Sequence, residues 1–198
     1  EGAPRITISA PLLEGSITSR GARIDDLILK NYRISLSEDS ENVKLFEPVS
    51  SANPYFSEFG WVSPADGQPM PSGKTIWKVL SSNLTPQTPV QLSWDNRNGL
   101  IFLRTISIND DYLIKIKDTI RSSLNKSISL NPYGLVRRIG TPSTQGMWIL
   151  HEGLLGVFDK TLKEWTYSDL QDDNKEGSNH NSEEPGGWAG ITDKYWLA

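Results

Sequence analysis

Three neighbouring segments in the middle of the chain alternate apolar and polar residues, and this pattern most restricts the possible folds. Clusters rich in Asn, Asp and Gly separate the segments. The segments are 90–94, 100–108 and 112–120, with the clusters at 95–99 and 109–111. Alternation at a period of two sends every second side chain to one face of a strand, and short turns join strands antiparallel. This stretch is therefore predicted to be a three-stranded antiparallel meander.

Shorter alternating or apolar runs predict further strands on both sides of the meander. They cover 5–8, 12–19, 23–32, 43–46, 75–80, 127–130, 133–139, 147–150, 154–158 and 163–167. Residues 23–32 also fit a helical spacing, but the short length and the flanking turns favour a strand. The last two runs predict a hairpin around Asp159-Lys160. Turn signals recur roughly every 8–12 residues, so the chain is predicted to be all-β, as a large antiparallel sandwich.

Composition narrows the class of protein without naming a function. A chain of 198 residues could form one domain or at most two small ones, and one domain covering 1–198 is expected. Its net charge of −4 argues against nucleic acid as a partner, because such proteins carry a basic stripe. The absence of cysteine excludes disulfides, thiolate metal sites and a cysteine nucleophile. Residues 1–4 are expected to be the start of a fragment cut from a longer chain, such as an excised ectodomain.

The last thirteen residues, 186–198, contain three aromatic residues and three glycines and follow a polar, loop-like stretch. Aromatic side chains bury large areas, and glycine lets a second backbone come close. This segment is therefore predicted to be a piece of specific packing in which Trp188 is buried.

No group of residues amounts to an active site. His151 and Glu152 are adjacent, and neighbours in a strand point to opposite faces, so a structural role is favoured. His180 lies in the polar stretch and is expected to be solvated. Paired aspartates at 25–26, 110–111 and 172–173 match no calcium loop, and turn capping explains them more simply. We therefore expect no metal, no cofactor and no catalytic residues.

Seven tryptophans are many for this length, and those near the end of the chain could form a binding groove for sugar or peptide. Packing within a sandwich is the favoured interpretation, and the groove is the alternative. The candidate residues for either role are Trp148, His151, Trp165, Tyr167, Trp188, Tyr195 and Trp196.

Four stretches, in this order, resemble the periplasmic domain of the YidC membrane protein insertase family, most closely the alphaproteobacterial kind. They are Leu12-Leu13-Glu14-Gly15-Ser16-Ile17-Thr18-Ser19-Arg20-Gly21-Ala22-Arg23-Ile24, Asn53-Pro54-Tyr55-Phe56-Ser57-Glu58-Phe59-Gly60-Trp61, His151-Glu152-Gly153 and Gly186-Gly187-Trp188-Ala189-Gly190-Ile191-Thr192-Asp193-Lys194-Tyr195-Trp196. The last stretch is the most specific.

The resemblance implies a β-supersandwich related to galactose mutarotases, lying on the periplasmic side of the inner membrane. It implies a non-catalytic part of a protein that helps membrane proteins to insert and fold. The implied partners are the Sec translocon subunit SecF and, through a membrane region outside this chain, nascent membrane proteins. In the family the sandwich continues past the terminal motif, so further strands are expected there, and their loss would expose a sheet edge.

Two other functions fit the same sequence. A sugar-binding or sugar-epimerising protein would share the mutarotase-like fold, but it needs an acid and a base across a cleft, and only His151 is a plausible base. A scaffold that merely spaces a membrane region from its partners is the third possibility.

Overall fold

The structure is a computed structural model that describes residues 2–63, 67–142, 151–172, 182–193 and 195–198. These residues form fourteen strands and one short helix, and the strands belong to three sheets. The expected all-β class is thus confirmed at the level of a mostly β protein with several antiparallel sheets. The chain divides into two compact units, Glu1–Ile139 and Gly140–Ala198.

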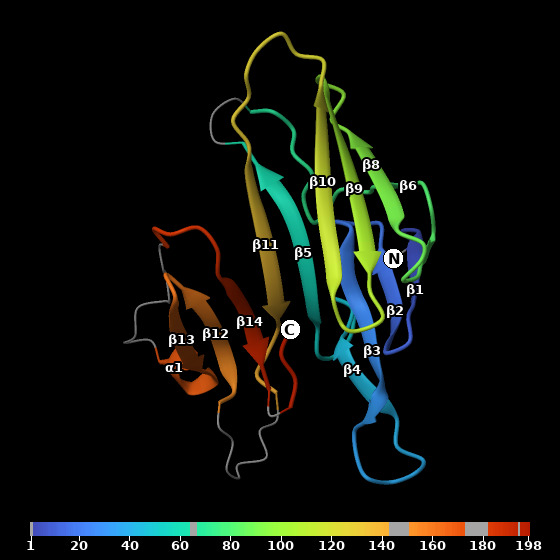
Figure 1. Cartoon of the computed structure of the whole chain (residues 1–198), viewed down its shortest axis with the longest axis vertical. Helices are drawn as coiled ribbons and strands as arrows, with labels where there is room; N and C mark the ends of the chain where they lie inside the picture. The colour runs from blue at the N-terminus through green and yellow to red at the C-terminus, as the bar shows by residue number, and fades with distance from the viewer. Residues whose placement is uncertain (1, 64–66, 143–150, 173–181, 194) are drawn as a thin grey trace. The chain divides into compact units, whose positions relative to one another are not determined.

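The first unit contains a seven-stranded sheet with the order β11-β5-β3-β2-β1-β7, in which β4 also pairs with β3. Every pairing is antiparallel except that of β1 with β7 (Figure 1). The strands are β1 (Arg5–Ser9), β2 (Leu13–Thr18), β3 (Arg23–Arg33), β4 (Asn42–Phe46), β5 (Tyr55–Val62), β7 (Asn83–Leu84) and β11 (Asn131–Arg138).

The second sheet of this unit contains the predicted meander. Its order is β10-β9-β8-β6, with β6 (Lys78–Val79), β8 (Val90–Asp95), β9 (Leu100–Ile108) and β10 (Ile114–Ser122). Adjacent strands pair antiparallel in unbroken register. The prediction for the meander is confirmed, with its third strand displaced by two residues toward the C-terminus.

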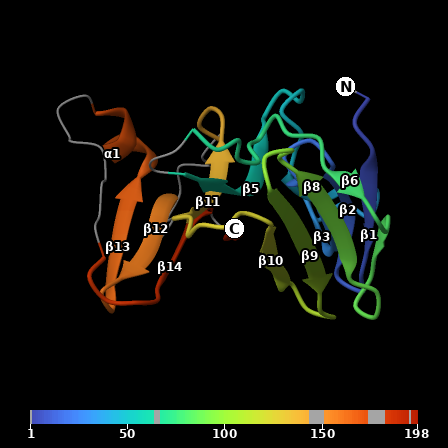
Figure 2. The same cartoon turned by 90° about the horizontal axis from the view of Figure 1, so that it is seen from above.

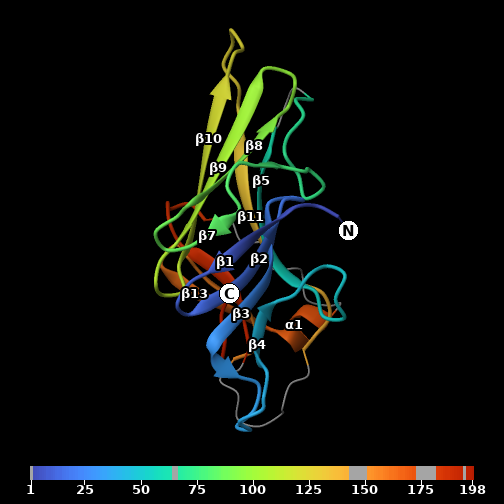
Figure 3. The ribbon, with the colours of Figure 1, turned by 90° about the vertical axis from the view of Figure 1, so that its right-hand side faces the viewer.

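The two sheets of the first unit form separate layers, with β8–β10 lying across from β1–β3 (Figure 2). The apolar faces of both layers are buried, for example Ile6 and Ile17 from one sheet and Phe102 and Ile106 from the other. Each such side chain contributes about 1.5–3 kcal/mol when it is removed from water. The connection between β3 and β4 projects from one end of this unit (Figures 1 and 3).

Three sequence predictions differ from the structure of the first unit. Residues 127–130 alternate but join no strand. The predicted strand 75–80 is reduced to Lys78–Val79, because Trp77 donates its N–H to Ser19 O and only the following residues pair with β8. Strand β5 was not predicted, since its first four residues are all buried and the alternation that identifies a strand is missing.

The second unit contains a three-stranded antiparallel sheet with the order β13-β12-β14. Its elements are β12 (Gly153–Phe158), β13 (Thr161–Thr166), α1 (Tyr167–Gln171) and β14 (Trp188–Thr192). Asp159 and Lys160 both have positive φ, at 49° and 63°, as the two-residue turn of a type I′ hairpin requires. The predicted hairpin is confirmed. Strand 147–150 and His180 lie outside the described residues.

The terminal motif packs as backbone against backbone. After β14 the chain reverses, and Ile191 and Ala198 exchange two backbone hydrogen bonds of 2.8 and 3.0 Å. A Cβ atom on Gly190 would lie 2.5 Å from Ala198 O, so only glycine admits the returning segment. The predicted role of glycine in close approach is confirmed here. The helix α1, the one helix among the described residues, is too short and too polar to span a bilayer.

Candidate functional site

The predicted aromatic candidates that the structure describes all lie in the second unit. His151 precedes β12, Trp165 lies on β13, Tyr167 begins α1, and Trp188 lies on β14. Tyr195 and Trp196 follow β14 in the turn of the terminal hairpin, and Trp148 lies outside the described residues.

The sheet register separates the two tryptophans on its strands. Trp165 pairs with Leu154, and Trp188 pairs with Val157 on the same central strand β12. Leu154 and Val157 are three positions apart, so their side chains point to opposite faces, as do those of their partners. Trp165 and Trp188 therefore do not share one face of this sheet, and a groove lined by both is not formed there.

Two contacts do connect candidates to the terminal hairpin. The Tyr167 hydroxyl donates to Asp193 Oδ1 at 3.1 Å, which links α1 to the end of β14. The rings of Tyr195 and Trp196 meet edge to face with centroids 6.3 Å apart. Tyr195 is 72% exposed, and Trp188 is 46% exposed. The expectation that Trp188 is buried is therefore wrong, because β14 presents this side chain outward.

His151 is engaged with the backbone. Its Nε2 lies 3.1 Å from Leu154 O, and a carbonyl can only accept, so this nitrogen donates. The contact fixes the ring at the start of β12. It supports the structural role that the sequence favours.

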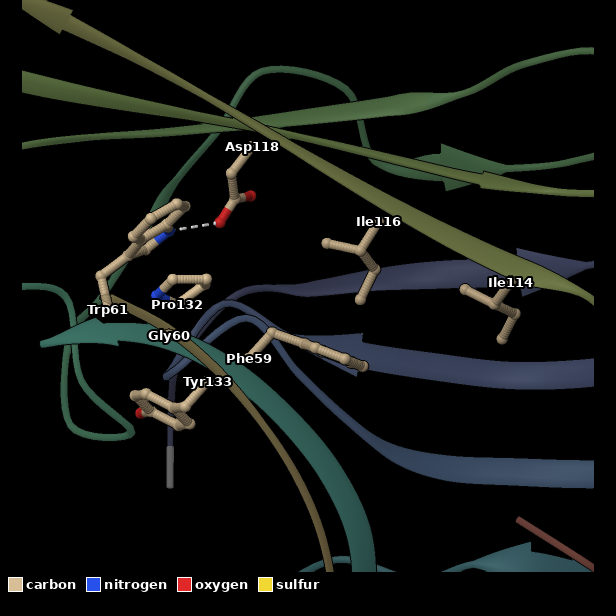
Figure 4. Close-up of a pocket in the computed structure, with 8 residues that line it drawn as sticks. All are labelled: Phe59, Gly60, Trp61, Ile114, Ile116, Asp118, Pro132 and Tyr133. Carbon is tan, nitrogen blue, oxygen red and sulfur yellow. Dashed lines mark hydrogen bonds between the residues drawn. The ribbon is translucent and has the colours of Figure 1, made fainter. Parts of the chain in front are cut away.

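A pocket of about 280 Å³ lies in the first unit, between the last strand of each sheet (Figure 4). Apolar and aromatic side chains make up most of its wall. The lining residues are Phe59, Gly60, Trp61, Ile114, Ile116, Asp118, Pro132 and Tyr133, from β5, β10 and β11. None of these residues was among the candidates predicted from the sequence.

The carboxylate that lines the pocket, Asp118, belongs to a buried ion pair. Arg104, which has no exposed surface, binds Asp118 through Nε (2.8 Å) and Nη2 (2.7 Å). Its Nη1 donates to Phe59 O at 2.9 Å, and Trp61 Nε1 donates to Asp118 Oδ2 at 2.7 Å. The pair thus connects β9 and β10 of one sheet to β5 of the other. Bidentate, charge-assisted bonds of this type are among the strongest in proteins.

A second polar cluster supports the pocket from β5 and β11. Glu58 accepts from Arg23 Nη2 at 2.7 Å and from the Tyr133 hydroxyl at 3.1 Å. Burial raises the pKa of the Tyr133 phenol, and the nearby Glu58 carboxylate raises it further. Tyr133 pairs with Gly60 across the two strands, and a Cβ at position 60 would overlap its ring.

The alternating pattern of the meander contained a signal for this site. Its inward-facing rows are apolar except for Arg104 in β9 and Asp118 in β10. These two residues are direct cross-strand partners. A charged residue in each of two neighbouring apolar rows predicts a buried ion pair, once the register of the strands is known.

Both ionisable side chains that line this pocket are engaged in hydrogen bonds within the fold. Asp118 accepts from Arg104 and Trp61, and the Tyr133 hydroxyl donates to Glu58. Among the described residues no three His, Cys, Asp or Glu side chains gather as a metal site would need.

Comparison with known proteins identifies the family. Residues 5–198 match the family described as the YidC periplasmic domain. The chain is 44% identical to the membrane protein insertase YidC of Methylobacterium nodulans, with 99% of this chain and 33% of that protein covered. The insertases of Granulibacter bethesdensis (42%, covering 100% of the chain and 34% of that protein) and Rickettsia bellii (43%, covering 98% and 34%) are similar.

This chain belongs to the YidC periplasmic domain family. The resemblance seen in the sequence is confirmed, and with it the periplasmic assignment that the family description carries. The chain spans about a third of the length of the curated YidC relatives it matches. Three of the quoted YidC motifs coincide with strands, since 12–24 contains β2, 53–61 contains most of β5, and 186–196 contains β14.

Proposed function

We propose that this YidC periplasmic domain is a non-catalytic interaction module of an inner-membrane protein insertase. The match of residues 5–198 to the family, with relatives named as membrane protein insertases, carries this proposal. In that role the domain contacts other proteins in the periplasm while membrane proteins, the clients of the whole insertase, insert and fold.

The polar groups of the first unit support a non-catalytic role. A sugar epimerase needs a free acid and a free base facing each other across a cleft. Asp118 and Glu58 are instead held by arginines within the fold. We expect calorimetry with a panel of hexoses, and an assay of mutarotation, to give no signal. Turnover of any hexose would overturn the non-catalytic assignment.

We also propose that the sheets of both units belong to one β-supersandwich of the type related to galactose mutarotases, and that 1–198 is one domain. The family match supports this, because it runs through both units without a break. Small-angle scattering of the purified chain tests the proposal. A single compact particle supports it, whereas an extended, two-body profile contradicts it.

The partner that we propose is the Sec translocon subunit SecF. Titration of the purified chain with the periplasmic segments of SecF, followed by calorimetry, tests this directly. Saturable binding at low micromolar concentration supports the proposal. Absence of binding at high micromolar concentration, with a chain shown to be folded, would exclude SecF as a direct partner of this domain.

A further inference from the structure

Strand β10 has one edge that no described strand covers. It pairs with β9 over nine residues, Ile114 to Ser122, and ends the order of its sheet. In an antiparallel sheet, alternate residues of an edge strand direct their N–H and C=O groups away from the paired neighbour. Such an edge is a template for one further strand from another chain.

The inner face of this edge is apolar except for Asp118, which binds Arg104, and it adjoins a cavity. Ile114, Ile116 and Asp118 point into the pocket of about 280 Å³, where Phe59 lies opposite (Figure 4). A strand added beside β10 would direct every second side chain toward this face. Apolar side chains at those positions would be removed from water in the pocket.

The outer face of the same edge is cationic. Lys115, Lys117 and Arg121 are exposed and form a row on β10, interrupted only by Thr119. Their cross-strand partners on β9 are Ser107, Thr105 and Ile101, which carry no charge. Within the described part of the chain none of the three cations forms an ion pair. The row is thus a local positive surface on a chain whose net charge is −4.

We propose that the free edge of β10 binds an extended segment of a partner protein in which acidic and apolar residues alternate. The acidic side chains lie beside Lys115, Lys117 and Arg121, and the apolar ones enter the pocket beside Ile114 and Ile116. This inference rests on the proposed role as an interaction module, but not on the identity of the Sec subunit.

The same charges argue against a second copy of the chain as the occupant. Antiparallel pairing of two β10 strands would set two rows of cations beside each other, and like charges across a strand pair are destabilising. Lysines on edge strands commonly prevent such self-pairing. A row that repels its own copy attracts an acidic strand, so charge selects the partner.

Synthetic peptides of about seven residues test the proposal, because that length matches a typical strand. Fluorescence anisotropy measures how tightly three labelled peptides bind to the full chain. They are an alternating Glu/Leu peptide, its Lys/Leu counterpart, and a Glu/Leu peptide that is N-methylated at alternate residues. We expect saturable binding of the first peptide only, weakened by added salt. N-methylation leaves the side chains in place but removes the backbone donors, so loss of binding identifies strand addition.

Charge reversal on β10 provides the matched variants. Lys117→Glu is compared with Lys78→Glu, since Lys78 lies on the outer face of the same sheet at its opposite edge. We expect Lys117→Glu to weaken binding of the Glu/Leu peptide about fivefold or more, and Lys78→Glu to leave it unchanged. The double variant Lys115→Glu/Lys117→Glu should bind the Lys/Leu peptide instead. A misfolded variant could lose binding but could not gain binding to the oppositely charged peptide.

Several results would overturn the inference. The first is that the Glu/Leu peptide does not bind at millimolar concentration. The second is that the Lys115→Glu/Lys117→Glu variant binds this peptide as tightly as the parent chain does. The third is that the N-methylated peptide binds as tightly as the unmethylated one. If light scattering shows a dimer that Lys117→Glu strengthens, the occupant of the β10 edge is a second copy of the chain. If the chain floats with phosphatidylglycerol vesicles and this requires Lys115 and Lys117, the cationic row binds a lipid surface. If SecF binds but the peptides do not, only the proposal of strand addition fails. If the peptides bind but SecF does not, only the proposal that SecF is the partner fails.

Discussion

Arg104 is the residue on which the pocket of the first unit depends. Removing its charge from water is costly, and four groups offset this cost. Both carboxylate oxygens of Asp118 and the carbonyl of Phe59 accept its hydrogen bonds, and the Trp77 ring lies 4.9 Å from its guanidinium carbon. A cation over an aromatic face gains more when both are desolvated, and Trp77 is 2% exposed.

Replacing Asp118 by Ala tests this arrangement. The substitution leaves a buried guanidinium without its counter-ion, and we expect the free energy of unfolding to fall by about 3–5 kcal/mol in urea titrations. Glu184→Ala is the control, because it breaks the exposed Lys160–Glu184 pair and should cost less than about 1 kcal/mol. Similar losses for both variants would mean that the buried pair is not a structural anchor.

Tyr133 gives the first unit a dependence of stability on alkaline pH. Burial raises the pKa of its phenol above the ordinary value of 10.0. The folded state therefore favours the protonated phenol, and this contribution is complete below pH 10 and is lost as pH rises through the folded pKa. We expect Tyr133→Phe to lose less stability than the parent chain in denaturant titrations from neutral to strongly alkaline pH. Parallel curves for the two proteins would contradict this.

At the residue level, the sequence holds a signal for part of this site, although neither residue of the ion pair was among the predicted candidates. Arg104 and Asp118 are recognisable as charged residues within apolar rows. Their connections to Phe59 and Trp61 were not predictable, because these contacts join strands that are far apart in the chain and in different sheets. Local periodicity contains no information about which strands of two layers face each other.

At the level of elements, the pairing of β14 with the last residues depends on a single missing side chain. Gly190 is buried, and Ala198 O occupies the place that a Cβ would take. We expect Gly190→Ala to separate the two segments, since backbone cannot yield as a flexible side chain does. Hydrogen exchange at the amides of Ile191 and Ala198 should accelerate at least tenfold.

Ala189→Ser is the control for that experiment, because Ala189 is exposed on the same strand. Its exchange rates should match those of the parent chain. Unchanged protection in Gly190→Ala would mean that the terminal segment adapts, and that the close approach at this glycine is not essential.

Two tryptophans differ in burial, and the loss of stability on substitution should follow that difference. Trp188 on β14 is 46% exposed, whereas Trp77 is 2% exposed. We expect Trp77→Ala to lower the free energy of unfolding by about 3–5 kcal/mol, and Trp188→Ala by about 1 kcal/mol. Thermal and urea unfolding of both variants measure the difference. A larger loss for Trp188→Ala would show that its ring is covered in solution.

Alternation made the strands of the meander predictable from the sequence, and its absence hid β5. The segments that became β8, β9 and β10 alternate clearly, with one face buried in β8 and β9 and one face half-buried in β10. In β5, Tyr55, Phe56, Ser57 and Glu58 are all buried, so the period of two is lost. Residues 127–130 show the opposite error, since they alternate without a strand to pair with.

For the whole molecule, the distribution of buried side chains differs sharply between the two units. Among the described residues, Ile191 is the one buried hydrophobic side chain of residues 140–198. Residues 1–139 hold the others, including the rows of Ile, Leu and Phe between their two sheets. Three strands need an apolar face with enough buried area to be stable alone, and the described side chains of the second unit bury little apolar area.

We therefore expect the two units to differ when they are expressed as separate fragments. Residues 1–139 should unfold cooperatively in urea, because this fragment retains both sheets and the Arg104–Asp118 pair, whose hydrogen bonds to Phe59 and Trp61 link them. Residues 140–198 should show no cooperative transition and little protection from hydrogen exchange. Far-ultraviolet circular dichroism and exchange measurements on both fragments decide the matter. A cooperative transition in 140–198 would mean that its sheet is stabilised by burial that the described side chains do not account for. Unfolded 1–139 would mean that its two-sheet core is insufficient by itself, and that only the whole chain, 1–198, folds as a unit.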